Sequence, residues 1–311
     1  MIVRQSLLDV EPIPRAVAIG SFDGVHTGHQ KVIGSAVAAG STRGVRSAVV
    51  TFHPHPLEVL RPELAPPELS SLARKAALVE ELGPDELIVI RFDAAFSQIS
   101  ADDFADHVLR DALDARHVSV GENFRYGHGA RGTTETLADE GTRLGFDVEV
   151  VPLLRAGGEA VSSSRIRRLL ADGAVEEARD LLGRPPWLEG AVVRGDGRGR
   201  DLGFPTANLS PLPRTPLPAT GIYAGSAHLP GSDHVAAISI GYNPTFTDSR
   251  DAVRIEAYLL DFDRDIYGSP IRLQLTHRLR DELRFESVEA LVEQLHRDVE
   301  QARRLAGFSG A

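Results

Sequence analysis

The hydrophobic pattern of this chain changes type once along its 311 residues, and that change constrains the fold more than any other feature. Before residue 155, short apolar runs of strand length alternate with segments of helical periodicity. After Pro185 and Pro186, apolar runs follow one another with only Pro- and Gly-rich connections between them. We therefore predict two domains, 1–184 and 187–311, of different fold class.

The first half predicts a Rossmann-like, doubly wound parallel sheet, because repeated strand–helix units place helices on both faces of a sheet. The second half predicts a small antiparallel β-barrel with a C-terminal helix. Two short helices are expected within 164–183, and 210–220, with four prolines, is expected to be a loop. The predicted strands are 16–20, 47–52, 87–92, 117–121, 147–151, 190–194, 221–227, 235–240, 253–260 and 271–279, and the other predicted helices are 29–39, 72–82, 101–113, 134–144 and 288–302.

The composition favours a cytoplasmic enzyme that acts on small molecules. The chain has no cysteine, no apolar signal segment and no apolar run near the ~20 residues of a membrane span. Its formal net charge of −10 opposes binding to nucleic acid, which normally requires a basic face. We expect neither nucleic-acid nor membrane partners, and the sequence leaves weak homo-oligomerisation open.

Lysine is nearly absent, and this restricts how the chain can handle phosphate. Of its 34 basic residues, only Lys31 and Lys75 are lysines. A Walker A loop and the strand lysine of protein kinases are both missing. Phosphoryl transfer in the second half would therefore have to use metal ions, backbone N–H groups and arginines.

Three polar segments, at 21–29, 53–56 and 122–127, follow three predicted strands of the first half. In open parallel sheets, ligands bind at the carboxyl ends of the strands. These segments are therefore expected to form one pocket.

The first of these segments suits phosphate. His26 and His29 share a face at the start of a helix, where N–H groups and the helix dipole favour anions. Gly24 and Gly28 allow close approach of a phosphate. The alternative is a zinc site that also uses the two histidines of 53–56.

Gly20-Ser21-Phe22-Asp23-Gly24-Val25-His26-Thr27-Gly28-His29 resembles the signature of the HxGH nucleotidyltransferase superfamily, whose members transfer a nucleotidyl group from a triphosphate to a phosphate acceptor. The resemblance implies that His26 and His29 stabilise the reacting phosphates. It also implies nucleotide contacts for Gly20, Phe22, Asp23, Gly24 and Gly28.

Ser162-Ser163-Ser164-Arg165-Ile166-Arg167 is similar to the second signature of that superfamily, S-S-T-x-x-R, with Ser164 in place of threonine. The resemblance implies that Arg167 contacts triphosphate oxygens, which suits a guanidinium fork, and that Ser163 and Ser164 contact phosphate. Taken alone, the segment also fits an ordinary helix N-cap.

Two further segments resemble the prokaryotic FAD synthetase module: Thr51-Phe52-His53-Pro54-His55-Pro56 and Gly121-Glu122-Asn123-Phe124-Arg125-Tyr126-Gly127. The resemblance implies flavin contacts for His55, Pro56, Asn123 and Phe124. Aromatic packing within a loop, and turn-forming histidines beside prolines, are the alternatives.

In the second half, Gly195, Gly197, Gly199 and Gly203 make a loop that can present N–H groups to phosphates. Thr206 and Asn208 alternate, so in an extended segment their oxygen donors point to one side and suit Mg²⁺. Glu256 lies in a predicted strand and could accept the proton of an attacking hydroxyl. An exposed strand glutamate is the alternative.

Gly203-Phe204-Pro205-Thr206-Ala207-Asn208 is similar to the hallmark of riboflavin kinase, and the segments at 221–225, 243–246 and 256–263 match in the same order. The resemblance implies phosphate and Mg²⁺ contacts for Thr206 and Asn208, phosphate contacts for Gly199 and Gly203, and a base role for Glu256. Tyr242 stands where the family commonly has threonine, which bears on ATP affinity.

Together the motifs predict a bifunctional enzyme with ATP, riboflavin and FMN as substrates and Mg²⁺ as cofactor. One domain would phosphorylate riboflavin to FMN, and the other would adenylylate FMN to FAD. The alternatives are loss of one activity, or a flavin-sensing or RNA-binding regulator on the same scaffold.

Overall fold

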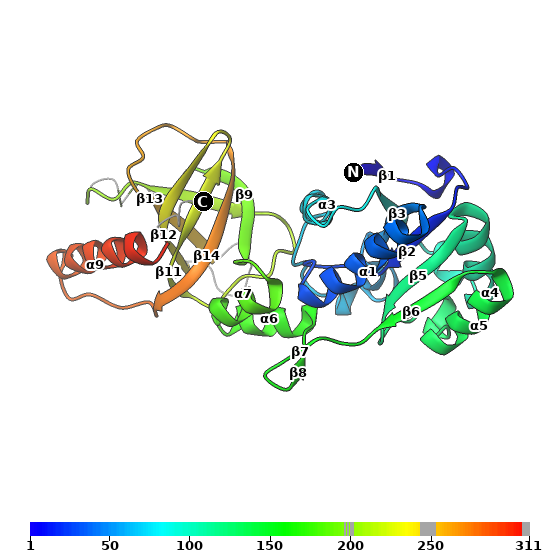
Figure 1. Cartoon of the computed structure of the whole chain (residues 1–311). Helices are drawn as coiled ribbons and strands as arrows, with labels where there is room; N and C mark the ends of the chain where they lie inside the picture. The colour runs from blue at the N-terminus through cyan, green and yellow to red at the C-terminus, as the bar shows by residue number, and fades with distance from the viewer. Residues whose placement is uncertain (196, 198, 200–201, 243–252, 307–311) are drawn as a thin grey trace. The chain divides into compact units, whose positions relative to one another are not determined.

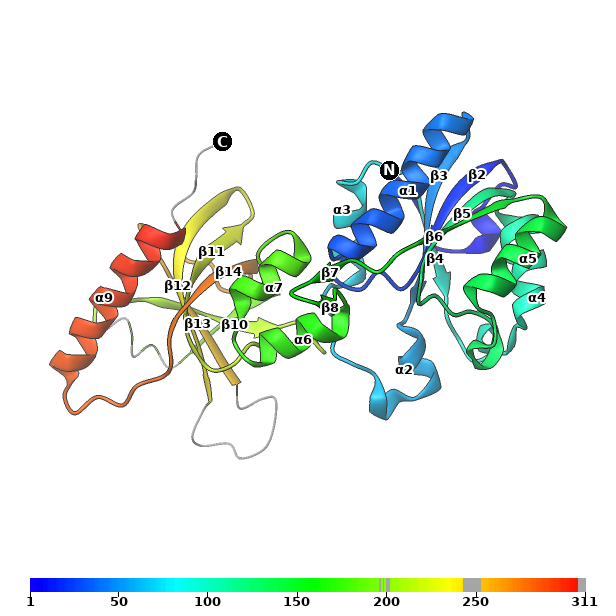
Figure 2. The same cartoon turned by 60° about the horizontal axis from the view of Figure 1, so that its bottom comes forward.

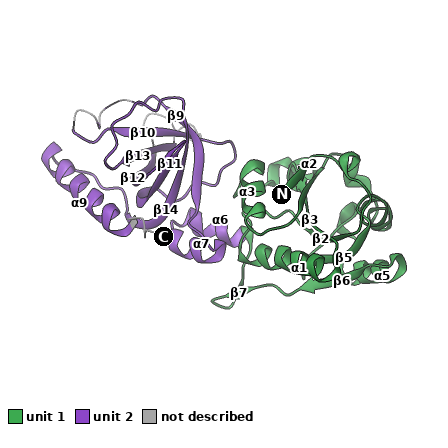
Figure 3. Ribbon diagram, turned by 45° about the horizontal axis from the view of Figure 1, so that its top comes forward, with its two compact units in different colours: residues 1–163 green, residues 164–311 purple. Residues whose placement is uncertain are grey.

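The computed structural model describes residues 1–195, 197, 199, 202–242 and 253–306 (Figure 1). The predicted kinase segment at 243–246 lies outside them. The chain divides into two compact units, Met1–Ser163 and Ser164–Ala311 (Figure 3). Within the described residues, no helix is both long and apolar enough to cross a membrane.

The first unit is built on a six-stranded sheet in which every paired neighbour is parallel. The order is β1-β4-β3-β2-β5-β6, so the connections change direction on either side of β2. This confirms the predicted parallel sheet. The prediction missed β1, because three half-exposed residues give no periodicity. The strands are β1 (Ile2–Arg4), β2 (Arg15–Ile19), β3 (Arg46–His53), β4 (Glu86–Arg91), β5 (Ala115–Gly121) and β6 (Asp147–Val151), with a small hairpin of β7 (Arg155–Ala156) and β8 (Glu159–Ala160).

Helices cover both faces of this sheet, as Figure 2 shows for α1 on one side and for α4 and α5 on the other. Val17 and Ile19 of β2 face the core that contains Phe104, Val108 and Leu137. The predicted helix at 101–113 forms as α4 and continues as a π-helix over Phe104–Ala112. The α-helices are α1 (Thr27–Arg43), α2 (Pro56–Leu60), α3 (Leu72–Glu80), α4 (Ala101–Asp103) and α5 (Thr134–Leu144).

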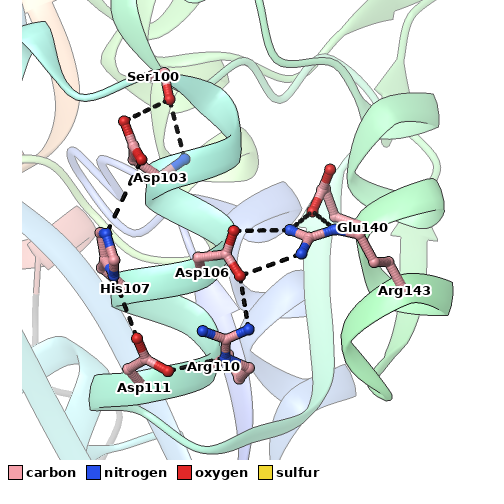
Figure 4. A network of polar contacts seen from close by, with 8 residues as sticks. All are labelled: Ser100, Asp103, Asp106, His107, Arg110, Asp111, Glu140 and Arg143. Carbon is pink, nitrogen blue, oxygen red and sulfur yellow. Dashed lines mark hydrogen bonds and ion pairs between the residues drawn. The ribbon is translucent and has the colours of Figure 1, made fainter.

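An exposed polar network joins the π-helix to α5 (Figure 4). Arg143 of α5 donates to both carboxylate oxygens of Asp106, at 3.2 and 2.9 Å, and it also contacts Glu140. Ser100 caps α4, since its Oγ accepts from the Asp103 N–H at 3.0 Å. The hydrogen bond from Arg143 holds the pKa of Asp106 below its usual value.

At the amino ends of the strands, a buried carboxylate meets three guanidinium groups. Arg15 Nε lies 2.6 Å from Glu86 Oε2, while Arg46 and Arg4 approach Oε1 at 3.2 and 3.5 Å. Burial alone would raise the pKa of Glu86, but the hydrogen bond from Arg15 and the three positive charges lower it.

We expect Glu86→Ala to reduce the free energy of unfolding of this unit by about 3–5 kcal/mol, because it leaves the buried Arg15 guanidinium unpaired. Since the folded pKa of Glu86 is depressed, its contribution is present above the unfolded pKa and is lost as the pH falls through the folded value. Urea denaturation measures the loss. Glu80→Ala, which removes an exposed ion pair with the N-terminus, is the control; an equal effect in both variants would contradict the prediction.

The second unit contains a closed barrel with the order β10-β13-β12-β11-β14-β9, in which all paired neighbours are antiparallel. This confirms the predicted barrel. The loop prediction for 210–220 was wrong at its start, since Ser210 and Pro211 end a sixth strand and pair there with Ala191 and Gly190 of β9. The strands are β9 (Trp187–Val193), β10 (Thr206–Pro211), β11 (Gly221–Leu229), β12 (Ser232–Tyr242), β13 (Val253–Leu259) and β14 (Pro270–Arg280).

Among the described residues, the helices of this unit are α6 (Ser163–Ala171), α7 (Val175–Leu182) and α9 (Val288–Ala306). The C-terminal helix α9 packs on β11, β12 and β14, as its apolar spacing predicts. The Glu176 carboxylate of α7 accepts from the Arg278 N–H of β14 at 3.0 Å. The helices α6 and α7 thus belong to the second compact unit, and a functional boundary between residues 184 and 187 stays a prediction.

Candidate active sites

The connection between β2 and α1 forms a strained loop that leads into a helix N-terminus. Phe22 and Val25 adopt positive φ angles of 47° and 40°, although both side chains are fully buried. Gly24 has a φ of 78°, and a Cβ there would lie 2.9 Å from Leu69 Cδ1. Such backbone persists only where the surrounding structure enforces it, which is typical of a functional loop.

The structure brings His26 and His29 together at the start of α1. His26 is the N-cap residue, and its Nδ1 accepts from the His29 N–H at 3.2 Å. The two rings stack with centroids 3.5 Å apart, and Phe22 meets His29 edge-on at 5.3 Å. Both imidazoles therefore stand where the helix dipole already favours a phosphate.

Asp23, which was predicted to contact nucleotide, is buried, and its carboxylate binds the backbone of a nearby segment of the same chain. Its carboxylate accepts from the N–H groups of Leu69 and Ser70, each at 3.2 Å. Its carbonyl accepts from the Ser163 hydroxyl at 2.8 Å. These contacts give Asp23 and Ser163 a structural task, and direct nucleotide contact stays a prediction for both. Ser164 and Arg167 lie on α6, and their contacts with phosphate likewise stay predictions.

An aromatic cavity of about 470 Å³ opens at the same carboxyl edge of the sheet. Phe124 and Tyr126 stack with centroids 5.7 Å apart in its wall, and Pro56 lines it as well. His55 instead caps α2, its Nδ1 accepting from the Leu57 N–H at 3.2 Å. Asn123 and His55 are not among the lining residues, so flavin contacts for them stay predictions.

Sequence reasoning missed half of this aromatic wall. Phe92 follows β4, and Phe96 and Phe104 come from the next turn and helix; all three line the cavity. Phe92 and Phe96 meet edge-to-face, with centroids 5.7 Å apart. A detectable signal existed, since Phe92 ends a predicted strand, as Phe52 does.

In the barrel, the predicted kinase residues form neighbouring rows across three strands. Asn208 of β10 lies opposite Glu256 of β13, which lies opposite Ser239 of β12. One row away, Thr206 lies opposite Tyr258. Residues two apart share a face of a sheet, so Thr206, Asn208 and Glu256 project to the same side.

These rows face a cavity of about 300 Å³, which Gly199, Thr206 and Glu256 line. Glu256 is half-buried, and Arg254 Nη1 lies 3.8 Å from its Oε1. Asn208 packs tightly against the glycine loop, because a Cβ on Gly195 would lie only 2.3 Å from Asn208 Nδ2. Any larger residue at 195 would displace the Asn208 amide.

One wall of this cavity comes from the end of β14 and the residues after it, and it was not anticipated from the sequence. Helix α9 supplies an apolar wall that includes Leu291 and Leu295. Arg280 pairs with the buried Asp298 of α9 at 2.6 Å, which fixes the helix against the barrel. Glu282 also lines the cavity, and burial raises the pKa of its carboxyl.

A second, more polar cavity of about 420 Å³ also meets Thr206. Asp263, Asp265 and Tyr267 line it, together with Arg264. Thr206 is therefore shared by a largely apolar cavity that contains Glu256 and by a polar one.

Within the described residues, no three His, Asp or Glu side chains gather to hold a metal ion, as the zinc alternative would require. The Thr206 hydroxyl and the Asn208 amide carbonyl are hard oxygen donors on one face of β10. They fit Mg²⁺, which keeps several waters and commonly takes its other ligands from substrate phosphates.

The two units match two known families. Residues 9–165 match the family described as FAD synthetase, and residues 182–306 match the family described as riboflavin kinase. The chain thus joins a nucleotidyltransferase domain to a phosphotransferase domain, which agrees with the fold and the motifs.

Relatives contain both domains along nearly their whole length. A bifunctional riboflavin kinase/FMN adenylyltransferase from Bacillus subtilis is 38% identical over 96% of this chain and 94% of its own. Its counterpart from Listeria monocytogenes is 40% identical over 94% and 92%. The chain belongs to the family of bifunctional riboflavin kinases/FMN adenylyltransferases, which confirms the family predicted from the motifs.

A solved structure has a similar fold over nearly the whole length of both chains. This is a crystal structure from Streptococcus pneumoniae, described as that of a macrolide-efflux protein. Its TM-score is 0.86 at 32% identity, and the match covers 97% of this chain and 98% of the other.

Proposed function

We propose that this chain converts riboflavin to FAD in two steps that each consume ATP. The barrel unit transfers the γ-phosphoryl group of ATP to the 5′-hydroxyl of riboflavin, which yields FMN and ADP. The first unit then joins the FMN phosphate to the α-phosphorus of a second ATP, which yields FAD and pyrophosphate. The observation that carries the proposal is that each unit combines residues suited to bind phosphate with a cavity whose aromatic or apolar wall suits a flavin ring.

In the first unit, both components lie at the carboxyl edge of one sheet. The aromatic cavity offers Phe124 and Tyr126 for stacking on the isoalloxazine ring. His26 and His29, at the N-terminus of α1, donate hydrogen bonds to ATP phosphates as charge shifts toward the departing pyrophosphate. The motif resemblance assigns a bidentate triphosphate contact to Arg167, which lies on α6 of the second compact unit.

In the barrel, Thr206 marks where the two substrates meet. The apolar cavity under α9 receives the riboflavin ring and presents its 5′-hydroxyl to Glu256, which accepts the proton. The polar cavity on the other side of Thr206 receives the nucleotide. Thr206 and Asn208 would hold Mg²⁺, which when bound neutralises charge on the transferring phosphoryl group.

Purified protein incubated with riboflavin, ATP and Mg²⁺ tests the proposal, with flavins separated by chromatography and pyrophosphate assayed in parallel. We expect FMN first, then FAD with one pyrophosphate per FAD. FMN without FAD would refute the role of the first unit. No FMN from riboflavin would refute the role of the barrel, and FMN supplied directly tests the first unit independently. Removal of Mg²⁺ with EDTA is expected to abolish both steps.

A further inference from the structure

Lys75 is a buried lysine whose role the phosphate motifs do not explain. It lies on α3 with 6% of its surface exposed. Its Nζ donates to the backbone carbonyl of Ser21 at 2.7 Å, and the Thr51 hydroxyl donates to the same oxygen at 3.0 Å. Burying an ammonium group is costly unless a specific contact compensates for it.

The contacted carbonyl belongs to the strained loop that leads to His26. Ser21 directly precedes Phe22, the first of the residues with positive φ. The segment that carries Lys75 holds the loop at two further points: Leu69 and Ser70 N–H groups donate to Asp23, and the Ser70 hydroxyl accepts from the Gly24 N–H at 3.1 Å. One short segment thus anchors three successive parts of the loop.

We propose, on the basis of the function proposed above, that Lys75 is a positioning residue for adenylyl transfer. Its ammonium group fixes the Ser21 carbonyl and thereby the loop that sets His26 and His29. It also places a positive charge behind the loop that receives the triphosphate, where a preorganised charge is most effective.

The charge state of Lys75 provides a specific readout. Burial lowers the pKa of Lys75, and the carboxylates of Asp23 and Glu68 oppose that shift. The cationic form is present below this pKa and is lost as the pH rises through it. FAD formation by the wild-type protein should therefore decline at a lower pH than the titration of an ordinary lysine would give.

The test measures FAD formation from FMN and ATP in Lys75→Met and Lys75→Arg, with riboflavin phosphorylation in the same samples as an internal reference. We expect Lys75→Met to reduce kcat by about 10²-fold, the cost of a small misplacement of catalytic groups. Lys75→Arg should recover part of the activity and lack the alkaline decline, because arginine stays charged. Lys31→Met, which removes the other, exposed lysine, is the control.

Several outcomes would contradict this role of Lys75. The proposal would be overturned if Lys75→Met formed FAD at the wild-type rate. It would also be overturned if Lys75→Arg showed the same alkaline decline as the wild type. If Lys75→Met fails to fold, Thr51→Val removes the second donor to the Ser21 carbonyl with little change of shape; unchanged kcat in that variant and an unchanged pH profile in Lys75→Arg would overturn it as well. A wild-type protein that makes no FAD would instead refute the proposed function itself.

Discussion

Replacing His29 with alanine is expected to reduce FAD formation from FMN and ATP by about 10²–10³-fold, the usual cost of removing one preorganised donor to a developing charge. His29 stands in the first turn of α1 and stacks on His26 at 3.5 Å, so its loss removes one donor and the packing of the other. The amounts of FAD and pyrophosphate formed after fixed reaction times measure the effect.

Riboflavin phosphorylation by the same His29→Ala protein should stay at the wild-type rate, because the barrel is a separate compact unit. His107→Ala is the matched control, since His107 is an exposed histidine of the π-helix that pairs with Asp111. An equal loss of both reactions in His29→Ala would indicate a folding defect, and undiminished FAD formation would refute the catalytic role.

The complementary result is expected from Glu256→Gln. It should reduce FMN formation by about 10²–10⁴-fold, the range that a positioned general base supplies. Glutamine keeps the size of the side chain and its place opposite Asn208, but it cannot accept the proton of the 5′-hydroxyl. FAD formation from added FMN should be unchanged.

Glu293→Gln is the control for this variant, because Glu293 is an exposed glutamate of α9 paired with Arg297. Wild-type FMN formation by Glu256→Gln would exclude Glu256 as the base. Glu282, whose carboxyl lines the same cavity, would then be the next residue to replace.

Local patterns predicted the fold because most helices and strands have a hydrophobic periodicity that can be recognised within a few residues. Strand–helix alternation predicted the parallel sheet, and its strand-end segments predicted which edge carries the site. β10 was harder to foresee, since Ser210 and Pro211 belong to a proline-rich stretch and become strand only through pairing with β9. The three-residue β1 depends likewise on pairing with β4.

The site residues likewise fall into those that local motifs predict and those that only the packing of the fold brings to the site. His26, His29 and Phe124 lie within continuous motifs, so the sequence could point to them. Phe104 and Leu295 reach their cavities only through packing of distant helices, which no local spacing encodes. Lys75 was noted as one of two lysines, but its contact could not be predicted, because a lone lysine in an amphipathic helix has no signature until the Ser21 carbonyl is placed beside it.

The ionic cluster of Glu86 with Arg4, Arg15 and Arg46 lies at the amino edge of the sheet, whereas the phosphate loop and the aromatic cavity lie at the carboxyl edge. The ion pairs that stabilise the unit and the residues proposed to bind and convert the substrates therefore lie at opposite ends of the same strands. Engineering can exploit this separation: a library confined to the amino edge should shift melting temperature while substrate preference stays fixed, and a library at the carboxyl edge should do the reverse.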